Sequence, residues 1–526
     1  MKKYILMIAA AAALGFSSCG SDYLDATPND AVSATTAFST TENCAMAVNG
    51  IAKLMTQQYL STQGMNGEGT IKNWCNTFNG NDCQKCNQTG WASLWNNLAT
   101  YKTSKTTSYN YYIWFYYYKL IGNANQVIDN IDNATGDEAD KQFIKAQALV
   151  YRAYSYYNLV TMYSKRWCDS NNGASDGVVL RLKATNSAEA QDEPLSTLAD
   201  TYTQIYKDLD DAIDLFTKSG LTREDTYLPD LSVAYAVKAR AALYREDWAM
   251  AASCAAKAKE GYKLMGASSY KAGFNAENDE WMWEVYEAED QTLYYYSYFA
   301  YIGSNSSASV CRSYPCAISK ELIDQIPAED VRRDLYLVPQ SDTEFKEMNK
   351  TTGRTTKGTM FTRGQQSGYV YSTSYIFGYM QFKLRASFMP GGGCFNLFRA
   401  AEMYYIQAEA DCHISGKESE AQALLTEVVK PYNEAYTCTK TGDELLEEVK
   451  LYRRFDLWGE GYDWTDCKRW KMDISRKALD VSKGLASPGN FHSTFAITIP
   501  ASDDTRWIWA IPNKECDYND LLKEND

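Results

Sequence analysis

The chain has 526 residues, of which 45% are hydrophobic and 14% aromatic, which is enough to bury a large core. Its formal net charge of −14 disfavours binding to nucleic acid and to other polyanions. Only two histidines occur, so the composition excludes a multi-histidine metal site and disfavours a histidine-dependent triad, and we expect no metal and no cofactor.

The N-terminus has the pattern of an export signal that ends in a lipid anchor. Two lysines precede an apolar stretch over residues 4–14, which is too short to span a bilayer. Small residues then lead into Cys19, and this stretch resembles a bacterial lipobox, which implies cleavage before Cys19 and lipid on its sulfur. An ordinary cleaved signal followed by an incidental cysteine is the alternative. We therefore expect a signal peptide over 1–18 and a lipidated tether over 19–40.

The other cysteines form no obvious metal site. Fourteen cysteines occur, so thirteen remain besides Cys19, and this odd number cannot all pair within one chain. Cys83 and Cys86 form a CxxC motif with Cys75 upstream, but no histidine and no second CxxC lies nearby to complete a zinc site. The sequence favours a loop disulfide or free thiols here over a metal.

Apolar residues recur at spacings of three and four along most of the chain, which predicts helices. In two places a helix, a short turn and a second helix carry small residues at helical spacing, at 231–262 and 399–429. This pattern is typical of tetratricopeptide-type hairpins, because small residues let two helices approach closely. The predicted fold class is mostly α, with such hairpins forming a scaffold. The predicted helices are 42–60, 111–131, 139–163, 202–216, 231–244, 248–262, 399–412, 418–429 and 444–457.

Two segments lack this regularity and are expected to form an irregular, loop-rich part with short strands. Residues 61–108 are rich in glycine, asparagine, threonine, serine and cysteine, which predicts a long, partly ordered loop region. Residues 266–395 combine loops with strand-like pieces, such as 281–286 and 369–371. Long loops in compact domains are often functional.

Two motifs in the second half resemble the SusD/RagB family of outer-membrane nutrient-binding lipoproteins. They are LFRAAEMYYIQAEA, residues 397–410, and LYRRFDLWGEGYDWTDCKRW, residues 451–470. Residues 144–164 and 510–520 resemble two further stretches of the family. The matching positions of the two motifs are Arg399, Glu402, Met403, Tyr404, Ile406, Ala408, Glu409 and Ala410, then Arg453, Arg454, Leu457, Gly459, Glu460, Gly461, Trp464, Asp466, Lys468, Arg469 and Trp470.

The second motif is dense in charges of both signs, and this could suggest an active site. Buried charges must be paired, so the same density predicts an internal network of ion pairs that frames the fold. Gly459 is expected to take the left-handed conformation that ends the preceding helix. The residues expected in the network are Arg453, Arg454, Asp456, Glu460, Asp466, Glu402 and Glu409.

The resemblance implies a non-enzymatic cell-surface lipoprotein that binds a nutrient and delivers it to a SusC-like TonB-dependent transporter in the outer membrane. A glycan is the leading hypothesis, because sugars stack on aromatic rings, and the chain has 41 tyrosines and 13 tryptophans. Capture of a peptide or glycopeptide is the alternative. A surface glycoside hydrolase is a third possibility, for which Glu402 and Glu409 lie about 10 Å apart along a helix, but both belong to the scaffold motif.

The resemblance also divides the chain. It implies a single SusD-like domain over 41–526, with a helical scaffold at about 111–265 and 396–470 and a ligand-facing part at about 61–108 and 266–395. In the family, loop aromatics from the early segment and from the segment after the middle strand build the ligand platform. Trp74 and Tyr296 are the expected stacking rings and Asn73 the expected hydroxyl partner. The ligand-binding candidates are Asn73, Trp74, Trp91, Trp95, Tyr294, Tyr295, Tyr296 and Tyr298.

Overall fold

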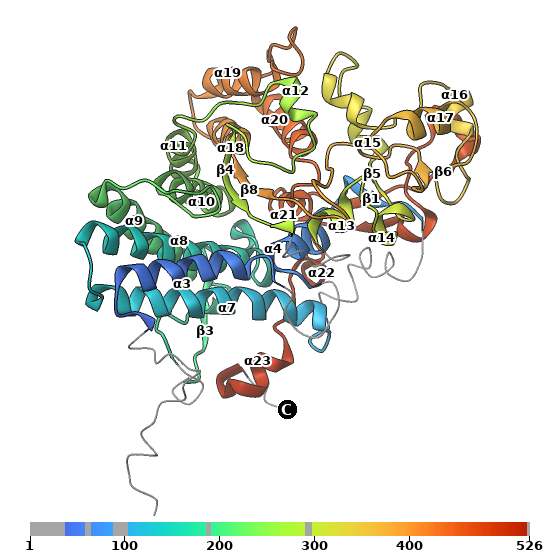
Figure 1. Ribbon diagram of the computed structural model, residues 1–526. Coiled ribbons are helices and arrows are strands. Elements are labelled where there is room, and N and C mark those ends of the chain that lie inside the picture. Colours follow the sequence, from blue (N-terminus) through green and yellow to red (C-terminus); the bar gives the residue numbers. More distant parts are fainter. Residues whose placement is uncertain (1–36, 58–64, 88–103, 186–190, 290–296, 523–526) are drawn as a thin grey trace, which may run out of the picture.

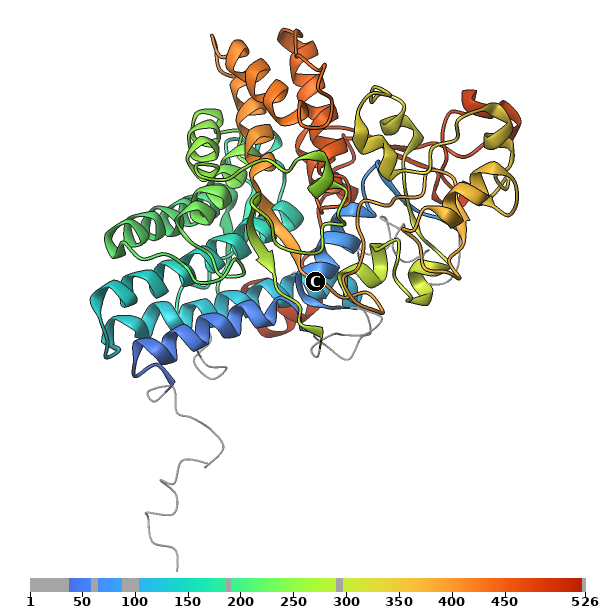
Figure 2. The same ribbon diagram turned by 45° about the horizontal axis from the view of Figure 1, so that its top comes forward.

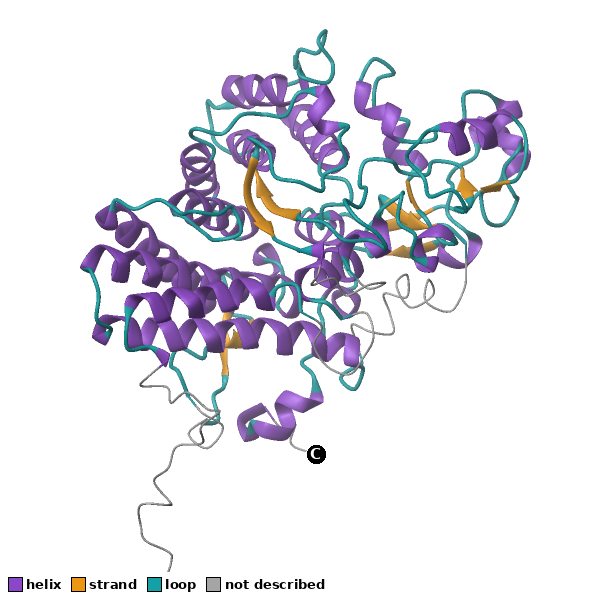
Figure 3. Ribbon diagram, viewed as in Figure 1, coloured by secondary structure: helices purple, strands orange, loops and turns teal. Residues whose placement is uncertain are grey.

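The computed structural model describes residues 37–57, 65–87, 104–185, 191–289 and 297–522. Helices dominate this part of the chain, and its named strands pair only as five two-stranded antiparallel sheets (Figure 3). The predicted mostly α fold class is therefore confirmed. None of the helices in these ranges is long and apolar enough to cross a membrane.

The first half of the chain packs four long helices side by side (Figure 1). Helix α7 (Ser108–Asn130) lies against α8 (Glu138–Tyr163), and α8 lies against α9 (Leu198–Ser219). Helix α3 (Thr41–Leu54) lies across both α7 and α8.

Two helical hairpins follow and confirm the tetratricopeptide-like pattern. Helices α10 (Leu231–Tyr244) and α11 (Trp248–Ala258) form the first hairpin. Helices α18 (Ala400–Cys412) and α19 (Glu418–Val429) form the second, and α20 (Gly442–Asp456) packs on α18. The buried face of α11 consists of three alanines and a cysteine, so α10 and α18 can both approach it closely.

Local signals explain where these helices begin and end. The side chains of Thr197 and Asp230 accept hydrogen bonds from backbone N–H groups in the first turns of α9 and α10. Gly220 ends α9 at φ +64°, a conformation that suits glycine. Two predicted helices are shorter than expected. The one over 42–60 ends at Leu54, and the one over 248–262 ends at Ala258, after which Gly261 turns the backbone at φ +86°.

Strands β4 (Trp281–Val285) and β8 (Phe395–Arg399) pair between the helical part and the loop-rich part (Figure 2). All ten residues of these two strands are buried. The other pairs are β1 (Cys83–Lys85) with β5 (Cys316–Ile318), β2 (Asp176–Val179) with β3 (Leu195–Thr197), β6 (Arg354–Thr355) with β7 (Ile376–Phe377), and β9 (Ile474–Arg476) with β10 (Ile497–Ile499).

Short helices complete the loop-rich part and the C-terminus. They are α4 (Gly67–Thr70), the π-helix η2 (Ile71–Thr77), α12 (Ala267–Tyr270), α13 (Tyr298–Ile302), α14 (Ser309–Arg312), α15 (Lys320–Ile323), α16 (Asp342–Lys346), α17 (Thr359–Gln366), α21 (Asp463–Arg469), α22 (Asp504–Trp507) and α23 (Asn513–Tyr518). The 3-10 helices are η3 (Ile131–Asn133), η4 (Trp167–Asp169), η7 (Val331–Leu335), η8 (Val481–Ala486), η9 (Ser493–Phe495) and η10 (Asp520–Leu522).

Two predictions for the irregular part can be compared with the structure. The region 61–108, expected as a partly ordered loop, is ordered at residues 65–87, which form α4, η2 and β1 and are almost wholly buried. Residues 369–371 do not form a strand. Gly368 turns the backbone at φ +74°, and the N–H of Tyr369 donates to the Ser367 hydroxyl, 3.1 Å away, instead of to a neighbouring strand.

Candidate functional site

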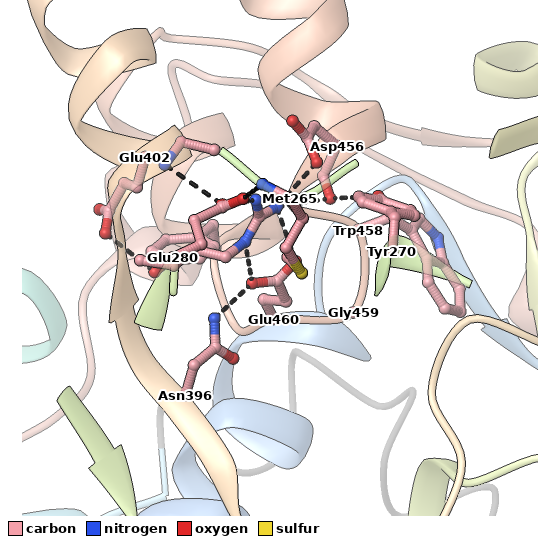
Figure 4. A network of polar contacts seen from close by, with 12 residues as sticks. Met265, Tyr270, Glu280, Asn396, Glu402, Asp456, Trp458, Gly459 and Glu460 are labelled. Atoms are coloured by element: carbon pink, nitrogen blue, oxygen red, sulfur yellow. Dashed lines mark hydrogen bonds and ion pairs between the residues drawn. The ribbon is translucent and has the colours of Figure 1, made fainter. Parts of the chain in front are cut away.

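Asp456 and Glu460 of the second motif are buried and gather around Arg399, which belongs to the first motif. The Arg399 guanidinium contacts Glu280 at 2.6 Å, Asp456 at 2.8 Å and Glu460 at 2.8 Å. Lys383 contacts the other oxygen of Glu460 at 2.6 Å. All of these side chains are buried, and Figure 4 shows the three carboxylates converging on the same point. Burial alone would raise the pKa of Glu460, but Arg399 and Lys383 hold that pKa well below its usual range.

The remaining arginines of the motif are paired in the same way. Arg453 contacts Asp466 at 2.7 Å, as predicted. Arg454 instead contacts Asp82 at 2.6 Å, a partner from the N-terminal segment, and Gly459 has the expected left-handed conformation at φ +80°. The predicted internal network is therefore confirmed.

The two carboxylates considered for hydrolysis belong to this network. Glu402 contacts Arg240 at 2.6 Å, and Glu409 accepts hydrogen bonds from Arg469 and from the Trp470 indole. Both side chains are almost completely buried. Because neither carboxylate can reach a substrate, this pair is unsuited to glycoside hydrolysis.

Three of the predicted ligand residues lie within the described ranges, and all three are buried. Asn73 and Trp74 belong to η2, and the Asn73 amide donates to the carbonyl oxygen of Tyr298, 3.1 Å away. The Trp74 ring packs against Tyr109 and Tyr301, at 5.1 and 5.5 Å between ring centroids.

The Tyr298 hydroxyl donates to the Gly459 carbonyl, 2.7 Å away, and its ring stacks on Phe395. The structure thus brings Asn73 and Tyr298 together, but a stacking role for Trp74 would require its ring to become exposed. Trp91, Trp95, Tyr294, Tyr295 and Tyr296 lie outside the described residues, so the binding role of the whole set stays a prediction.

The CxxC cysteines are buried thiols. Cys83 ends up in β1 and Cys86 follows it, and neither forms a disulfide. Burial raises the pKa of the Cys86 thiol well above its usual value, so this thiol is not activated. Within the described ranges, no group of three or more histidine, cysteine or acidic side chains is arranged to hold a metal ion.

One candidate site among the described residues is a pocket of about 210 Å³ beside the end of β4, which we call the Tyr286 pocket. Its walls come from the last turns of α3, from the loop before α10, and from the last residues of β4 and the one that follows. The Tyr286 side chain is 52% exposed, and its ring lies 5.7 Å from that of Tyr227. The lining residues are Asn49, Ala52, Lys53, Met55, Tyr227, Glu284, Val285 and Tyr286.

Strand geometry explains how Tyr286 and Glu284 come to share this pocket. The pairing of β4 with β8 shifts register between Trp283 and Glu284, so strict alternation does not hold there, and the consecutive residues Glu284, Val285 and Tyr286 all line the pocket. Trp283 packs its ring against Tyr151 and Tyr154 of α8 in the core.

Glu284 is the polar group that distinguishes this pocket from ordinary packing. Its side chain is only 5% exposed, yet its Oε2 has no hydrogen-bond partner among the described residues. Burial, together with the nearby Glu277, raises the pKa of Glu284 to about 7, and Arg223 opposes this shift. A buried carboxylate without a donor is costly, and a perturbed carboxyl in a pocket marks a candidate binding site.

The pocket therefore offers an exposed aromatic face beside a buried hydrogen-bond acceptor. This combination suits a ligand with an apolar face and hydroxyl groups. The sequence predicted part of the site in the segment after the middle strand, at the tyrosines of 294–298. A glutamate within the otherwise apolar strand WMWEV was the available signal for Glu284.

Comparison with known proteins identifies the family. Residues 249–526 match the model described as "SusD family", and residues 22–243 match the one described as "Starch-binding associating with outer membrane". The chain belongs to the SusD family. Members of the SusD family are non-catalytic binding proteins. No curated protein matches the chain.

Solved SusD-like structures share the fold over nearly the whole chain. A SusD-like carbohydrate binding protein from Bacteroides vulgatus ATCC 8482 is 24% identical and has a TM-score of 0.74, with 92% of this chain and 97% of that chain covered. A putative sugar binding protein from the same organism is 21% identical, has a TM-score of 0.71, and covers 92% and 98%. A SusD superfamily protein from Bacteroides thetaiotaomicron VPI-5482 is 20% identical, has a TM-score of 0.68, and covers 93% and 100%. At these identities the likeness establishes the fold alone.

Proposed function

We propose that this SusD-family protein is a cell-surface lipoprotein that binds a glycan and delivers it to a SusC-like TonB-dependent transporter in the outer membrane. The observation that carries the proposal is the buried carboxylate of Glu284 beside the exposed ring of Tyr286. Such a pair can bind the apolar face of a sugar ring and accept a hydrogen bond from its hydroxyl group.

The family context supports the same ligand class. One matched model is described as starch-binding, and two solved structures with this fold are described as carbohydrate- or sugar-binding. Three of the residues that line the Tyr286 pocket, Glu284, Val285 and Tyr286, belong to the predicted ligand-facing part of the chain and are close in sequence to Tyr294, Tyr295 and Tyr296. We propose that these tyrosines, with Trp91 and Trp95, extend the binding surface around the pocket.

The proposed lipid anchor rests on the N-terminal sequence, and the proposed transporter partner rests on the family resemblance. We propose that lipid on Cys19 holds the protein on the outer membrane, because the lipobox-like stretch ends there. The family model that matches residues 22–243 is described as associating with the outer membrane.

The transporter partnership is tested by purifying the tagged protein from cells that express a SusC-like transporter. Co-purification of the barrel supports it, and recovery of the protein alone after crosslinking contradicts it.

The ligand class is tested by screening a glycan array and a peptide library in parallel, with Tyr286→Ala as the site variant. Tyr518 is 86% exposed and lies in α23, so Tyr518→Ala is the matched control. We expect glycan binding that Tyr286→Ala weakens about five- to thirtyfold and that Tyr518→Ala leaves unchanged. Binding to peptides alone, or equal glycan affinity of Tyr286→Ala and wild type, would overturn the proposal.

A further inference from the structure

The loop-rich end of the molecule carries a local excess of positive charge. Residues 348–401 contain no aspartate or glutamate but seven lysines and arginines, although the chain as a whole has a net charge of −14. Strand β6 and helix α17 belong to this segment and lie at the end of the molecule away from α9 (Figure 1). The segment is therefore basic within an otherwise acidic protein.

Only part of this charge is neutralised inside the fold. Arg363 pairs with Glu344 at 2.8 Å, and Lys383 and Arg399 belong to the buried ion network. The cations of the segment that form no ion pair with a described residue are Lys350, Arg354, Lys357 and Arg385.

Three tyrosines in the loop before β7 each have an arginine against their ring. The arginines come from three different places in the chain, namely β6, the end of α14 and the loop after β7. The distances from guanidinium carbon to ring centroid are 3.6 Å for Arg354 and Tyr375, 4.3 Å for Arg385 and Tyr369, and 5.8 Å for Arg312 and Tyr371. We call these six residues the Arg–Tyr surface. Tyr375 is 38% exposed, and the other five side chains are half-buried.

Hydrogen bonds hold two of these arginines in place without neutralising them. The Arg312 guanidinium donates to the carbonyl oxygen of Ser307 and to the Thr373 hydroxyl, both 2.7 Å away. The Arg385 guanidinium donates to two backbone carbonyl oxygens, both 2.6 Å away. All four acceptors are uncharged, so the positive charges stay available. Side chains that are already fixed lose less conformational entropy when a partner binds.

Exposed lysines add to the positive charge at the edge of this surface. Lys350 and Lys357 flank β6 and are both exposed. Exposed lysines of α9 are paired differently, since Lys207 and Lys218 each contact an aspartate one turn away. Unpaired charges of one sign repel one another, and an anionic partner relieves that repulsion.

The residue types and the position indicate the kind of partner. Arginine and tyrosine are enriched in protein–protein interfaces, where lysine is depleted. A lipid surface is disfavoured by position, because helix α3, which follows the proposed tether, lies toward the other end of the molecule (Figure 1).

We propose that the Arg–Tyr surface, with Lys350 and Lys357 at its edge, docks an acidic surface of a partner protein. Carboxylates of the partner pair with the arginines, and the summed positive charge steers its approach. This docking surface is independent of the Tyr286 pocket and of the ligand that the pocket binds.

The experiment measures the binding of labelled synthetic peptides by fluorescence anisotropy at about 50 and about 300 mM NaCl. The probes are a glutamate-rich peptide, a lysine-rich peptide of the same length, and labelled dextran sulfate, a polyanion without peptide groups. Lys350→Glu reverses an exposed charge, whereas Arg354→Lys keeps the charge but removes the planar group that stacks on Tyr375. Lys430→Glu reverses an exposed charge at the end of α19 and is the matched control. Thermal melting verifies that each variant is folded.

We expect the glutamate-rich peptide to bind at the lower salt concentration and to bind at least about tenfold more weakly at the higher one. The lysine-rich peptide should not bind. Lys350→Glu and Arg354→Lys should each weaken binding of the glutamate-rich peptide about two- to tenfold, and Lys430→Glu should leave it unchanged.

Three results would overturn the docking surface. They are no binding of the glutamate-rich peptide, equal binding of the two peptides, and variants at Lys350 and Arg354 that both bind like wild type. Binding of dextran sulfate without binding of the glutamate-rich peptide would also overturn it, because the partner would then be a sulfated polymer and not a protein. None of these results bears on glycan binding at Tyr286, so the two proposals fail separately.

Discussion

The indole N–H of Trp283 donates a hydrogen bond to the carbonyl oxygen of Tyr227, 3.0 Å away. Trp283 is buried in the core against α8, so this bond fixes the loop that carries Tyr227 to a rigid strand. The Tyr227 and Tyr286 rings are thereby held together at the end of β4 before any ligand arrives. A surface that is ordered in advance loses less entropy on binding.

Glu284→Gln should weaken glycan binding and stabilise the fold at pH 8. The pKa of Glu284 in the folded protein is raised from 4.5 to about 7, so its stability contribution is lost as pH rises through this interval. The neutral amide avoids that loss, and we expect a gain of about 1–3 kcal/mol in the free energy of unfolding at pH 8. Urea titration measures the stability and calorimetry the affinity.

Glu287 provides a matched control for this prediction. Burial raises the pKa of Glu287 to about 7 as well, but its carboxylate accepts a hydrogen bond from the Gly393 N–H, 3.2 Å away, and it does not line the Tyr286 pocket. Glu287→Gln should leave glycan affinity unchanged. A Glu284→Gln protein that is less stable than wild type at pH 8 and binds normally would contradict the assignment.

Glycan affinity should rise with pH and level off above about pH 7. Hydroxyl donors of a ligand favour the ionised carboxylate, so binding lowers the pKa of Glu284 and releases a proton below that pH. The charged groups that face Glu284 are Glu277 and Asp225, which raise its pKa, and Arg223, which lowers it. Calorimetry at several pH values tests this, and the pH dependence should disappear in Glu284→Gln. A flat profile in wild type would show that no hydroxyl reaches this carboxylate.

Removing one member of the buried ion network should cost stability and spare binding. Glu460→Ala leaves Arg399 and Lys383 short of a partner, and such a change typically costs about 3–5 kcal/mol. Arg453→Ala should act in the same direction with a smaller loss, because Asp466 loses one of its two arginine partners and keeps Arg469 at 2.7 Å. Urea denaturation measures the loss.

The ion pair of Lys440 with Glu444 is exposed to solvent and serves as the control for the buried network. Lys440→Ala should change the free energy of unfolding by no more than about 0.5 kcal/mol. A Glu460→Ala protein that unfolds like wild type but no longer binds glycan would mean that the motif acts in recognition.

Cys19→Ala should release the protein from the membrane, because a lipid chain on this sulfur is the proposed anchor. Cell fractionation and surface labelling measure the change. Cys168 is an exposed thiol in the folded part, so Cys168→Ala serves as the control and should stay membrane-bound. Unchanged partition of Cys19→Ala would contradict the lipoprotein interpretation.

Most helices could be predicted from the sequence, because helical periodicity and capping are local properties. Helix α10 has the predicted bounds, and α18 and α19 lie within one residue of theirs. The partner of Arg454 could not be predicted, because Asp82 lies 372 positions away and no local pattern links the two. Long-range pairing depends on how the elements pack, which the sequence motif alone does not reveal.

The candidate site could likewise be predicted only in part, because it depends on how distant segments pack. Alternation in β4 indicates which side chains share a face, but not which face another segment will cover. The Trp283 ring packs against the core and its indole N–H bonds to the loop that carries Tyr227, yet that loop leaves the Tyr286 pocket open beside it. Tyr298 was expected at the ligand surface, yet it begins the short helix α13 and is buried against Phe395.

The most direct test of the central claim is a crystal structure of the protein with the glycan that the array selects. The account predicts a sugar ring against the exposed face of Tyr286 and a sugar hydroxyl within about 2.6–3.0 Å of a Glu284 carboxylate oxygen. A glycan bound elsewhere, with no contact to Tyr286 or Glu284, would contradict it.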